Sequence, residues 1–339
     1  MPEGGWDDAV MDAAVKVEGL SKRFGDVHAL DGIDFGIAQG TIFGLLGPNG
    51  AGKTTAVRIL ATVLKPDAGH AEVLGHDVVH DAESVRMLIG LAGQYAAVDP
   101  NLTGRENLAL MGKLAQVEPS AIGPRAAELL QQFDLMDAAD RPVRTYSGGM
   151  RRRLDVAASL VQKPPVLFLD EPTTGLDLQS RHELWRAIRT LVDEGTTVIL
   201  TTQYLEEADQ LAHRLVVVDR GAIIAEGTAR QLKDRLGGTV IEMTMAGEDD
   251  IARAISLVEP IAGAKVERDG LLLRLPSPDG SHLLAQVIRR LDEEGVLPAT
   301  VSLREPSLDD VFLSLTGHVA EDATAAEGAQ ERAKGGDGR

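Results

Sequence analysis

The feature that most constrains this chain is the segment Gly-Pro-Asn-Gly-Ala-Gly-Lys-Thr at residues 47–54. Glycines let a backbone curl so that successive N–H groups converge on an anion, and the spacing is that of a phosphate-binding P-loop. A β-rich run at Thr41–Leu46 precedes the segment and a helical pattern at Thr54–Thr62 follows it. The alternative is a Gly-rich turn without a ligand, but the strand–loop–helix context favours a nucleotide site.

Each part of this loop has an expected task. Lys53 is expected to reach the β- and γ-phosphates, and the Thr54 hydroxyl is expected to bind Mg²⁺. The helix that follows adds a partial positive charge at its N-terminus. A guanine-specific site would need Asn-Lys-x-Asp after a later strand, and the nearest match, Lys65-Pro66-Asp67, lacks the Asn. The residues expected to contact ATP are Gly47, Pro48, Asn49, Gly50, Ala51, Gly52, Lys53, Thr54 and Thr55.

A second motif is the apolar run Val166–Leu169 followed by the carboxylates Asp170 and Glu171. It has the form of a Walker B strand, in which Asp170 holds Mg²⁺ directly or through water. Glu171 would then lie beside the γ-phosphate, where it can polarise the attacking water. An ordinary strand followed by an acidic turn is the alternative interpretation.

Ser147-Gly148-Gly149, between Tyr146 and Met150, is a second candidate anion site, since a hydroxyl and two glycine amides precede a helical pattern. This segment lies shortly before the Walker B strand, and it resembles the ABC signature, which is usually Leu-Ser-Gly-Gly-Gln and lies at the same place in that family. Tyr and Met depart from that motif at its ends, whereas the Ser-Gly-Gly centre is intact. The resemblance implies an ABC-type P-loop NTPase with a helical signature subdomain. It also implies a homodimer, in which the signature of one subunit closes over ATP held by the P-loop of the other.

The same resemblance assigns further residues, in a pattern that spans Ser21 to Gln203, about half of the chain. Gln94 matches the Q-loop glutamine, which senses Mg²⁺ and links the site to a membrane subunit. The metal ligands implied are therefore Thr54, Gln94 and Asp170. Asp177 matches the D-loop residue that crosses the dimer interface. Phe24 occupies the place of the aromatic that stacks on adenine, where Tyr is more usual.

Gln203 stands where the family normally has a switch histidine. Glutamine can hydrogen-bond a phosphate oxygen, but it cannot carry charge or accept a proton near neutral pH. General-base duty is therefore assigned to Glu171, and a positioning role to Gln203. The alternative is that Gln203 merely ends a strand.

Composition excludes several classes of protein. The 339 residues contain no cysteine, so disulfides, thiolate catalysis and zinc–thiolate sites are excluded. A net charge of −18 argues against nucleic acid as a partner and against unaided docking to an anionic membrane. No run reaches the roughly 18 apolar residues that a spanning helix needs, and Met1–Ala14 is acidic without the apolar core of a secretory signal. The expected location is the cytoplasm, at the inner face of the membrane through a separate permease.

The pattern along the chain predicts two domains. Strand-like and helical runs alternate within residues 15–236, which we expect to form the α/β ATPase domain, after a flexible N-terminus at residues 1–14. The pattern over residues 239–318 predicts a small α+β domain with the order β-α-β-β-α-β, which suggests a ferredoxin-like unit. Residues 319–339 are expected to form a disordered tail.

In the ATPase domain the clearest strands are Thr41–Leu46, Val166–Asp170, Thr197–Thr202 and Arg214–Asp219, and the clearest helices are Glu106–Leu114, Ile122–Phe133 and Gln179–Val192. In the small domain the strands are Thr239–Met245, Ala264–Arg268, Leu271–Leu275 and Thr300–Leu303, and the helices Asp249–Val258 and Ser281–Glu294.

Two segments resemble the ATPase subunits of drug exporters of the daunorubicin/doxorubicin-resistance type: Thr201–Asp209, with its Gln, and Glu305–His318. The resemblance implies export, with the second segment supporting assembly with the membrane partner. Leu308, Val311, Phe312 and Leu315 share one helical face, which the chain's own small domain could equally cover. Two rival functions are a soluble ABC ATPase acting on nucleic acid or ribosomes, and a nucleotide-binding regulator that does not hydrolyse ATP.

Overall fold

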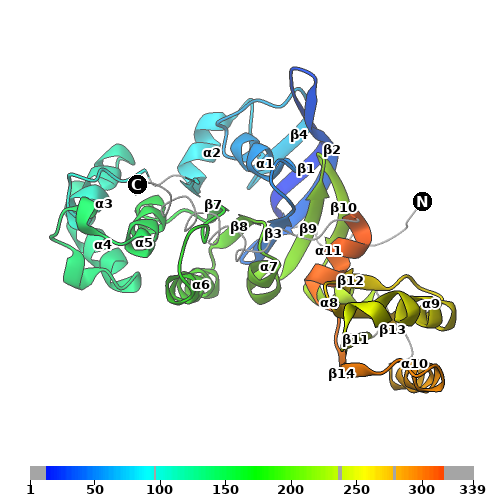
Figure 1. The fold of residues 1–339 in the computed structure, drawn as a ribbon. Helices are drawn as coiled ribbons and strands as arrows, with labels where there is room; N and C mark the ends of the chain where they lie inside the picture. Colours follow the sequence, from blue (N-terminus) through cyan, green and yellow to red (C-terminus); the bar gives the residue numbers. More distant parts are fainter. Residues whose placement is uncertain (1–12, 95–96, 236–238, 278–279, 317–339) are drawn as a thin grey trace, which may run out of the picture. The chain divides into compact units, whose positions relative to one another are not determined.

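The computed structural model describes residues 13–94, 97–235, 239–277 and 280–316. The chain folds into two compact units, with the boundary between Glu226 and Gly227 (Figure 1). This division falls before residue 236, where the sequence pattern changes, because helix α8 (Ala229–Asp234) packs against α11 (Leu308–Thr316) at the end of the C-terminal unit. The tail expected at residues 319–339 lies outside the described residues.

The N-terminal unit contains two sheets. A six-stranded sheet has the order β10-β9-β3-β8-β7-β6, and a four-stranded sheet has the order β2-β1-β4-β5. Pairing is parallel from β9 through β6 in the first sheet and antiparallel throughout the second. The strands of the six-stranded sheet are β3 (Ile42–Leu46), β6 (Ile89–Ala92), β7 (Val166–Asp170), β8 (Thr197–Thr202), β9 (Arg214–Asp219) and β10 (Ala222–Gly227). Those of the second are β1 (Ala13–Phe24), β2 (Val27–Ala38), β4 (Ala68–Val73) and β5 (His76–Asp77).

The central strands are apolar along their whole length because both faces of the sheet are covered. Every residue of β3, β7 and β8 is buried. One apolar cluster joins the sheet to the helices drawn in green in Figure 1, and another joins it to the antiparallel strands, where Phe35 and Phe43 stack at 5.4 Å. The helices of the unit are α1 (Lys53–Leu60), α2 (Ala82–Leu88), α3 (Gly104–Leu114), α4 (Pro119–Gln132), α5 (Gly148–Ser159), α6 (Leu178–Asp193) and α7 (Leu205–Leu211).

Local signals explain where the elements begin. Helix α3 begins at Gly104, before the expected Glu106, because Thr103 and Glu106 form a reciprocal capping box. Helix α4 likewise begins early, at Pro119, which suits the first turn of a helix. Two residues of the N-terminal segment expected to be flexible are ordered, since Ala13 and Ala14 belong to β1 and Ala14 is fully buried. Residues 1–12 lie outside the described part of the chain.

The C-terminal unit follows the expected β-α-β-β-α-β order, and its antiparallel sheet has the order β12-β13-β11-β14. Its core joins one face of this sheet to α9 and α10. The expected helix ending at Val258 is longer, because α9 continues through Pro260 until Gly263 ends it with a left-handed φ of 64°. This extension displaces the next strand to 267–269. The elements after α8 are β11 (Thr239–Met245), α9 (Ile251–Ala262), β12 (Glu267–Asp269), β13 (Leu272–Ser277), α10 (Ser281–Glu293), β14 (Pro298–Arg304) and α11.

Candidate functional site

The predicted site residues follow neighbouring strands of the six-stranded sheet. Parallel strands present their carboxyl ends at one edge, which is where ligands bind in open α/β sheets. The order β3-β8-β7-β6 therefore brings together the residues after each strand: the P-loop, Gln203, Glu171 and Gln94. These residues are far apart in the sequence, and the sheet alone makes them neighbours.

Two glycines of the P-loop are required by close backbone approach. A Cβ on Gly47 would lie 2.2 Å from the carbonyl oxygen of Val218, so no larger residue fits there. Gly52 has a φ of 111°, and its Cβ would lie 2.3 Å from the carbonyl oxygen of Ala29. These contacts hold the loop directly against the sheet and against β2, at the start of α1.

Lys53 lies inside the loop rather than in solvent. Its Nζ donates to the carbonyl oxygens of Gly47 at 2.7 Å and Pro48 at 3.0 Å. Burial lowers the pKa of Lys53, and this shift is opposed by the nearby carboxylates of Glu171 and Asp170. The Nζ atom is 3.6 Å from Oε1 of Glu171. The ammonium is thus placed at the mouth of the loop with an acidic partner beside it.

Asp170 accepts two hydroxyl hydrogen bonds on one oxygen. The Thr54 Oγ1 donates to its Oδ1 over 3.0 Å, and the Thr201 Oγ1 donates to the same atom over 2.6 Å. Thr201 lies on β8 and is fully buried. Thr54 and Asp170 are therefore in direct contact. The sequence assigns both residues to the metal, one from the P-loop and one from the Walker B strand.

Glu171 has an unusual backbone conformation for its residue type. Its φ is 48°, in the left-handed region that costs a non-glycine residue roughly 1 kcal/mol or more. Its N–H donates to the carbonyl oxygen of Thr201 at 3.1 Å and to the Thr201 Oγ1 at 3.0 Å. The buried carboxylate accepts from Gln94 Nε2 at 3.0 Å through Oε2. The fold thus imposes a strained turn that directs this carboxylate toward Lys53 and Gln94.

A cavity of about 190 Å³ lies over these groups. It contains most of the predicted phosphate-binding residues together with Gln94 and Glu171. Two residues from β2 complete the wall, and no sequence motif predicts either of them. The lining residues are Val27, Ala29, Asn49, Gly50, Ala51, Gly52, Lys53, Thr54, Thr55, Gln94 and Glu171.

Phe24 lies outside this cavity, at the tip of the β1–β2 hairpin. It is 51% exposed and pairs in register with Val27, which does line the cavity. The Nζ of Lys22 lies 5.7 Å from the centre of its ring. Asp67 holds this end of the hairpin, since it accepts from Lys22 Nζ and from the Arg23 N–H, each at 2.7 Å. An exposed aromatic face is therefore fixed beside the phosphate loop.

The signature residues also lie outside the cavity of their own chain. Ser147 caps α5 by accepting the Met150 N–H at 3.2 Å, and both Ser147 and Gly148 are exposed. Tyr146, which stands where the usual signature has Leu, is buried, and its hydroxyl donates to the carbonyl oxygen of Ala138 at 2.7 Å. It therefore serves as a core anchor in place of Leu.

Asp177 and the signature are physically joined. Asp177 caps α6 by accepting from the N–H of Ser180 at 2.8 Å and from its Oγ at 3.1 Å. These hydrogen bonds lower the pKa of Asp177. A Cβ on Gly149 would lie only 2.3 Å from the Ser180 Oγ, so α5 and α6 touch at this point.

Gln203 follows β8, and its Oε1 is buried without a hydrogen-bond partner among the described residues. Sequence reasoning missed two participants of this region, Thr201 and Arg152. Thr201 has no sequence signal, because a threonine within a β-rich run is ordinary. Arg152 belongs to the basic run Arg151–Arg153, and no sequence signal shows that it is buried.

Within the described ranges, no helix is both long and apolar enough to cross a bilayer. In the same part of the chain, no group of three or more His, Cys, Asp or Glu side chains is arranged to hold a metal ion.

Comparison with known proteins agrees with this geometry. The family model described as ABC transporter matches residues 30–174. The chain is 55% identical over 306 residues to the daunorubicin resistance ATP-binding protein DrrA3 of Streptomyces coeruleorubidus, covering 90% of this chain and 96% of that protein. It is 49% identical to the daunorubicin/doxorubicin resistance ATP-binding protein DrrA of Streptomyces peucetius, covering 94% and 97%. It is 41% identical to the Nod factor export ATP-binding protein I of Ralstonia nicotianae, covering 91% and 95%.

Solved structures agree as well. CbiO1 of Clostridium perfringens, part of the ABC transporter complex cbiONQ, is 26% identical with a TM-score of 0.61, and the match covers 65% of this chain and 90% of that one. The cassette MJ0796, in a dimeric post-hydrolysis state with ADP and Pi, is 25% identical with a TM-score of 0.58, covering 63% and 98%. By these matches, this chain belongs to the ABC transporter family as an ATP-binding and ATP-hydrolysing subunit, related to the daunorubicin and doxorubicin resistance ATP-binding proteins.

Proposed function

We propose that the cavity binds ATP with Mg²⁺, and that the roles of its residues follow their positions. The P-loop amides and Lys53 would hold the phosphates, and Phe24 would stack on the adenine. Thr54 and Asp170 would hold Mg²⁺, because a hydroxyl and a carboxylate oxygen already lie 3.0 Å apart and hard oxygen ligands suit this ion. Gln94 supplies a further amide beside them. Bound Mg²⁺ would neutralise charge that develops on the phosphates.

Glu171 is proposed as the general base for hydrolysis. The observation that carries this assignment is its strained, buried position between Lys53 and Gln94, since such strain is retained where a site depends on it. Its carboxylate would orient and polarise the attacking water. Gln203 would contact the γ-phosphate without carrying charge, through a hydrogen bond donated by its side-chain NH₂ group. Its buried Oε1 has no hydrogen-bond partner among the described residues.

The working unit is proposed to be a head-to-tail homodimer. Ser147, Gly148 and Asp177 are exposed and lie outside the cavity of their own chain, so a second chain would be needed to bring an anion site to the ATP. The dimeric state of MJ0796 supports this arrangement. ATP would drive closure only to the extent that it binds the closed dimer better than the open one.

A separate permease in the cell membrane is proposed as the partner at the cytoplasmic face, with Gln94 near the contact. The relatives named for daunorubicin and doxorubicin resistance and for Nod factor export support export of an amphipathic or hydrophobic small molecule. We propose a drug-like compound as the substrate. Coexpression of the chain with its permease should reduce cellular doxorubicin accumulation, and the Glu171→Gln variant should abolish the reduction. Unchanged accumulation with active ATPase would redirect the search to another substrate.

The first test of the mechanism is ATP turnover of the full-length chain and of its Glu171→Gln variant, with size-exclusion chromatography in ATP and Mg²⁺. We expect the variant to lose turnover by about a hundredfold or more and to accumulate as an ATP-dependent dimer. Glu194→Gln is a matched control, because Glu194 is an exposed carboxylate after α6. A variant that hydrolyses ATP at the wild-type rate would remove Glu171 from the role of base.

A further inference from the structure

The signature helix α5 carries two buried arginines at adjacent positions. Arg152 and Arg153 are only 7% and 8% exposed. Burying a guanidinium is costly unless hydrogen bonds and opposite charges compensate it. Each of these side chains therefore needs a set of partners, and the two sets differ.

Arg152 binds the backbone on both sides of Glu171. Its Nη2 donates to the carbonyl oxygen of Asp170 at 3.0 Å, and its Nε donates to the carbonyl oxygen of Pro172 at 2.9 Å. One planar group thus contacts the residue before the proposed base and the residue after it. The strained turn at Glu171 is held from outside the sheet by a helix that begins with the signature.

The same guanidinium reaches the segment that carries Gln94. Its Nη1 donates to the carbonyl oxygen of Gly93, the residue directly before Gln94. Nη1 also donates to Asp155 Oδ2 at 3.2 Å, and the other oxygen of Asp155 accepts the Ala97 N–H at 2.7 Å. Arg152 and Asp155, one turn apart on α5, therefore hydrogen-bond the backbone on both sides of Gln94. The Gln94 side chain itself donates to Glu171.

Arg153 makes none of these contacts. Its Nη1 donates to the carbonyl oxygen of Phe133 at 2.9 Å and lies 3.3 Å from Glu183 Oε2. Both partners belong to helices away from the cavity, α6 and the end of α4. The neighbouring arginines thus share burial, charge and helix but serve different parts of the unit.

We propose that Arg152 is a positioning residue for hydrolysis. Its guanidinium fixes the backbone around Glu171 and Gln94 relative to the signature helix, and Asp155 completes the link. A displacement of α5, or of the segment that holds Gln94, consequently moves the carboxylate of Glu171. This inference rests on the proposed role of Glu171 as base. It requires the fork of a guanidinium, because a lysine ammonium in the same place cannot reach the Gly93, Asp170 and Pro172 carbonyls in one plane.

The test compares Arg152→Lys with Arg153→Lys in the full-length chain, since both changes keep the charge and remove a buried fork. We expect Arg152→Lys to lower kcat by about tenfold or more, as small misplacements of catalytic groups do, while KM for ATP stays within about twofold. Arg153→Lys should lower the Tm by a similar amount and keep kcat within about twofold. Equal losses of kcat in the two variants, or a change in KM alone, would overturn the proposal.

Hydrogen exchange provides a readout that does not depend on turnover. Arg152→Lys should speed exchange in peptides that contain Gln94 and Glu171, whereas Arg153→Lys should speed it near Phe133. Should Arg152→Lys fail to fold, Asp155→Asn should still speed exchange around Ala97 and lower kcat. Unchanged exchange in both Arg152→Lys and Asp155→Asn contradicts the proposal. An inactive Glu171→Gln beside a fully active Arg152→Lys would refute only this inference, whereas an active Glu171→Gln would refute the role of Glu171.

Discussion

Gln94 Nε2 donates a hydrogen bond to Glu171 Oε2 over 3.0 Å, joining the residues that follow two neighbouring strands. Among the described residues, the same oxygen also accepts a longer hydrogen bond from the Thr174 hydroxyl, at 3.5 Å. Gln94 is therefore the main side chain that orients this edge of Glu171. A glutamine expected to act on the metal and the membrane partner is also bound to the proposed base, so both tasks meet in one side chain.

Removing this hydrogen bond should affect the chemical step more than nucleotide binding. We expect Gln94→Ala to lower kcat by about tenfold, because Glu171 loses its orienting donor, and to change the Kd for ATP by less than about threefold. Stopped-flow turnover and equilibrium binding of a fluorescent ATP analogue would check this. A loss confined to binding would show that Gln94 holds the nucleotide or metal rather than the base.

Gln203→Ala should slow hydrolysis while leaving ATP binding nearly unchanged. The physical reason is that a phosphate oxygen accepts hydrogen bonds, so only the NH₂ group of Gln203 can donate to it, while its buried Oε1 has no partner among the described residues. Loss of one such donor typically costs about a hundredfold to a thousandfold in kcat. Single-turnover measurements at saturating ATP would separate chemistry from binding, and wild-type turnover in the variant would reduce Gln203 to the end of a strand.

Asp67 should influence nucleotide affinity from outside the cavity. It accepts from Lys22 Nζ and the Arg23 N–H, and thereby fixes the end of β1 that presents Phe24. We expect Asp67→Asn to raise KM for ATP by about twofold to threefold with kcat unchanged, and Phe24→Ala to raise it further, because stacking on adenine is then lost. Phe24→Tyr keeps the aromatic face and is the control. An unchanged KM in Phe24→Ala would exclude the stacking role.

Motif-bearing parts of the fold could be predicted from the sequence because their chemistry is local. The strands Val166–Asp170, Thr197–Thr202 and Arg214–Asp219 have the predicted bounds, since continuous apolar runs between turn signals leave little freedom. The resemblance to ABC ATPases assigned Gln94 and Glu171 to one site with the P-loop, and the strand order β3-β8-β7-β6 explains why these residues converge. The membership of the ABC transporter family is confirmed by the relatives.

Other features depend on long-range contacts that no local pattern encodes. The burial of Arg152 could not be predicted, because a run of three arginines usually faces solvent, and only the fold shows the carbonyls around it. The double role of Thr201 likewise exists only once β7 and β8 are paired. The predicted helix ended at Val258, whereas α9 continues through Pro260, which removes one backbone hydrogen bond, until Gly263 ends it.

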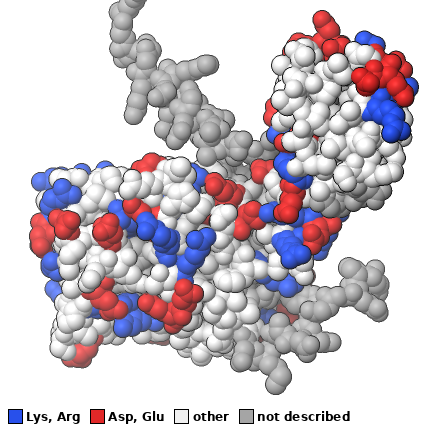
Figure 2. Space-filling view, turned by 90° about the horizontal axis from the view of Figure 1, so that it is seen from below, with Lys and Arg blue, Asp and Glu red and all other residues white. Residues whose placement is uncertain are grey.

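On the face drawn in Figure 2, acidic and basic side chains are interspersed over both units. His70 on β4 has a carboxylate beside each ring nitrogen, since Glu72 Oε1 lies 2.8 Å from its Nε2 and Asp77 Oδ2 lies 3.0 Å from its Nδ1. Glu18 occupies the paired position on β1. The hydrogen bond to Glu72 raises the pKa of His70, burial opposes this shift, and the charges of Asp77, Glu72 and Glu18 add to it.

This shift predicts a modest loss of stability as the pH rises. A histidine whose folded pKa is above its ordinary value of 6.5 stabilises the fold fully below that value and loses the contribution as pH rises through the folded pKa. The Tm of the wild type should therefore fall more than that of His70→Gln between about pH 6 and about pH 8. The difference should be small, because the side chain is 42% exposed and solvent screens it. Parallel pH profiles would contradict the prediction.

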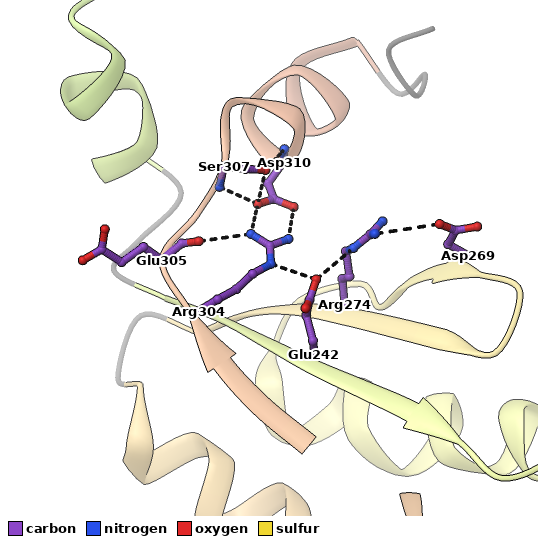
Figure 3. A network of polar contacts seen from close by, with 7 residues as sticks. All are labelled: Glu242, Asp269, Arg274, Arg304, Glu305, Ser307 and Asp310. Atoms are coloured by element: carbon purple, nitrogen blue, oxygen red, sulfur yellow. Dashed lines mark hydrogen bonds and ion pairs between the residues drawn. The ribbon is translucent and has the colours of Figure 1, made fainter. Parts of the chain in front are cut away.

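In the C-terminal unit, the ion pair between Arg304 on β14 and Asp310 on α11 anchors this helix to the end of the strand (Figure 3). Two parallel hydrogen bonds of 2.6 and 2.8 Å join the guanidinium to the carboxylate, and Arg304 Nε donates to Glu242 at 2.8 Å. Asp310 also accepts the Ser307 N–H at 2.7 Å, while the Ser307 Oγ accepts the Asp310 N–H at 3.2 Å. This is a reciprocal cap that begins α11. Leu308, Val311 and Phe312 are buried, whereas Leu315 is 43% exposed.

Asp310→Ala should consequently loosen α11 by about 2 to 3 kcal/mol, since it removes a bidentate ion pair and a helix cap together. Arg290→Ala is the control, because Arg290 pairs with Glu293 and Glu294 on an exposed surface, where such pairs contribute less than about 1 kcal/mol. Hydrogen exchange is the suitable measurement, because a chain of two units need not unfold in one transition. Peptides of α11 should lose protection in Asp310→Ala, while peptides of α1 keep it. Unchanged protection of α11 would show that its apolar contacts alone hold the helix.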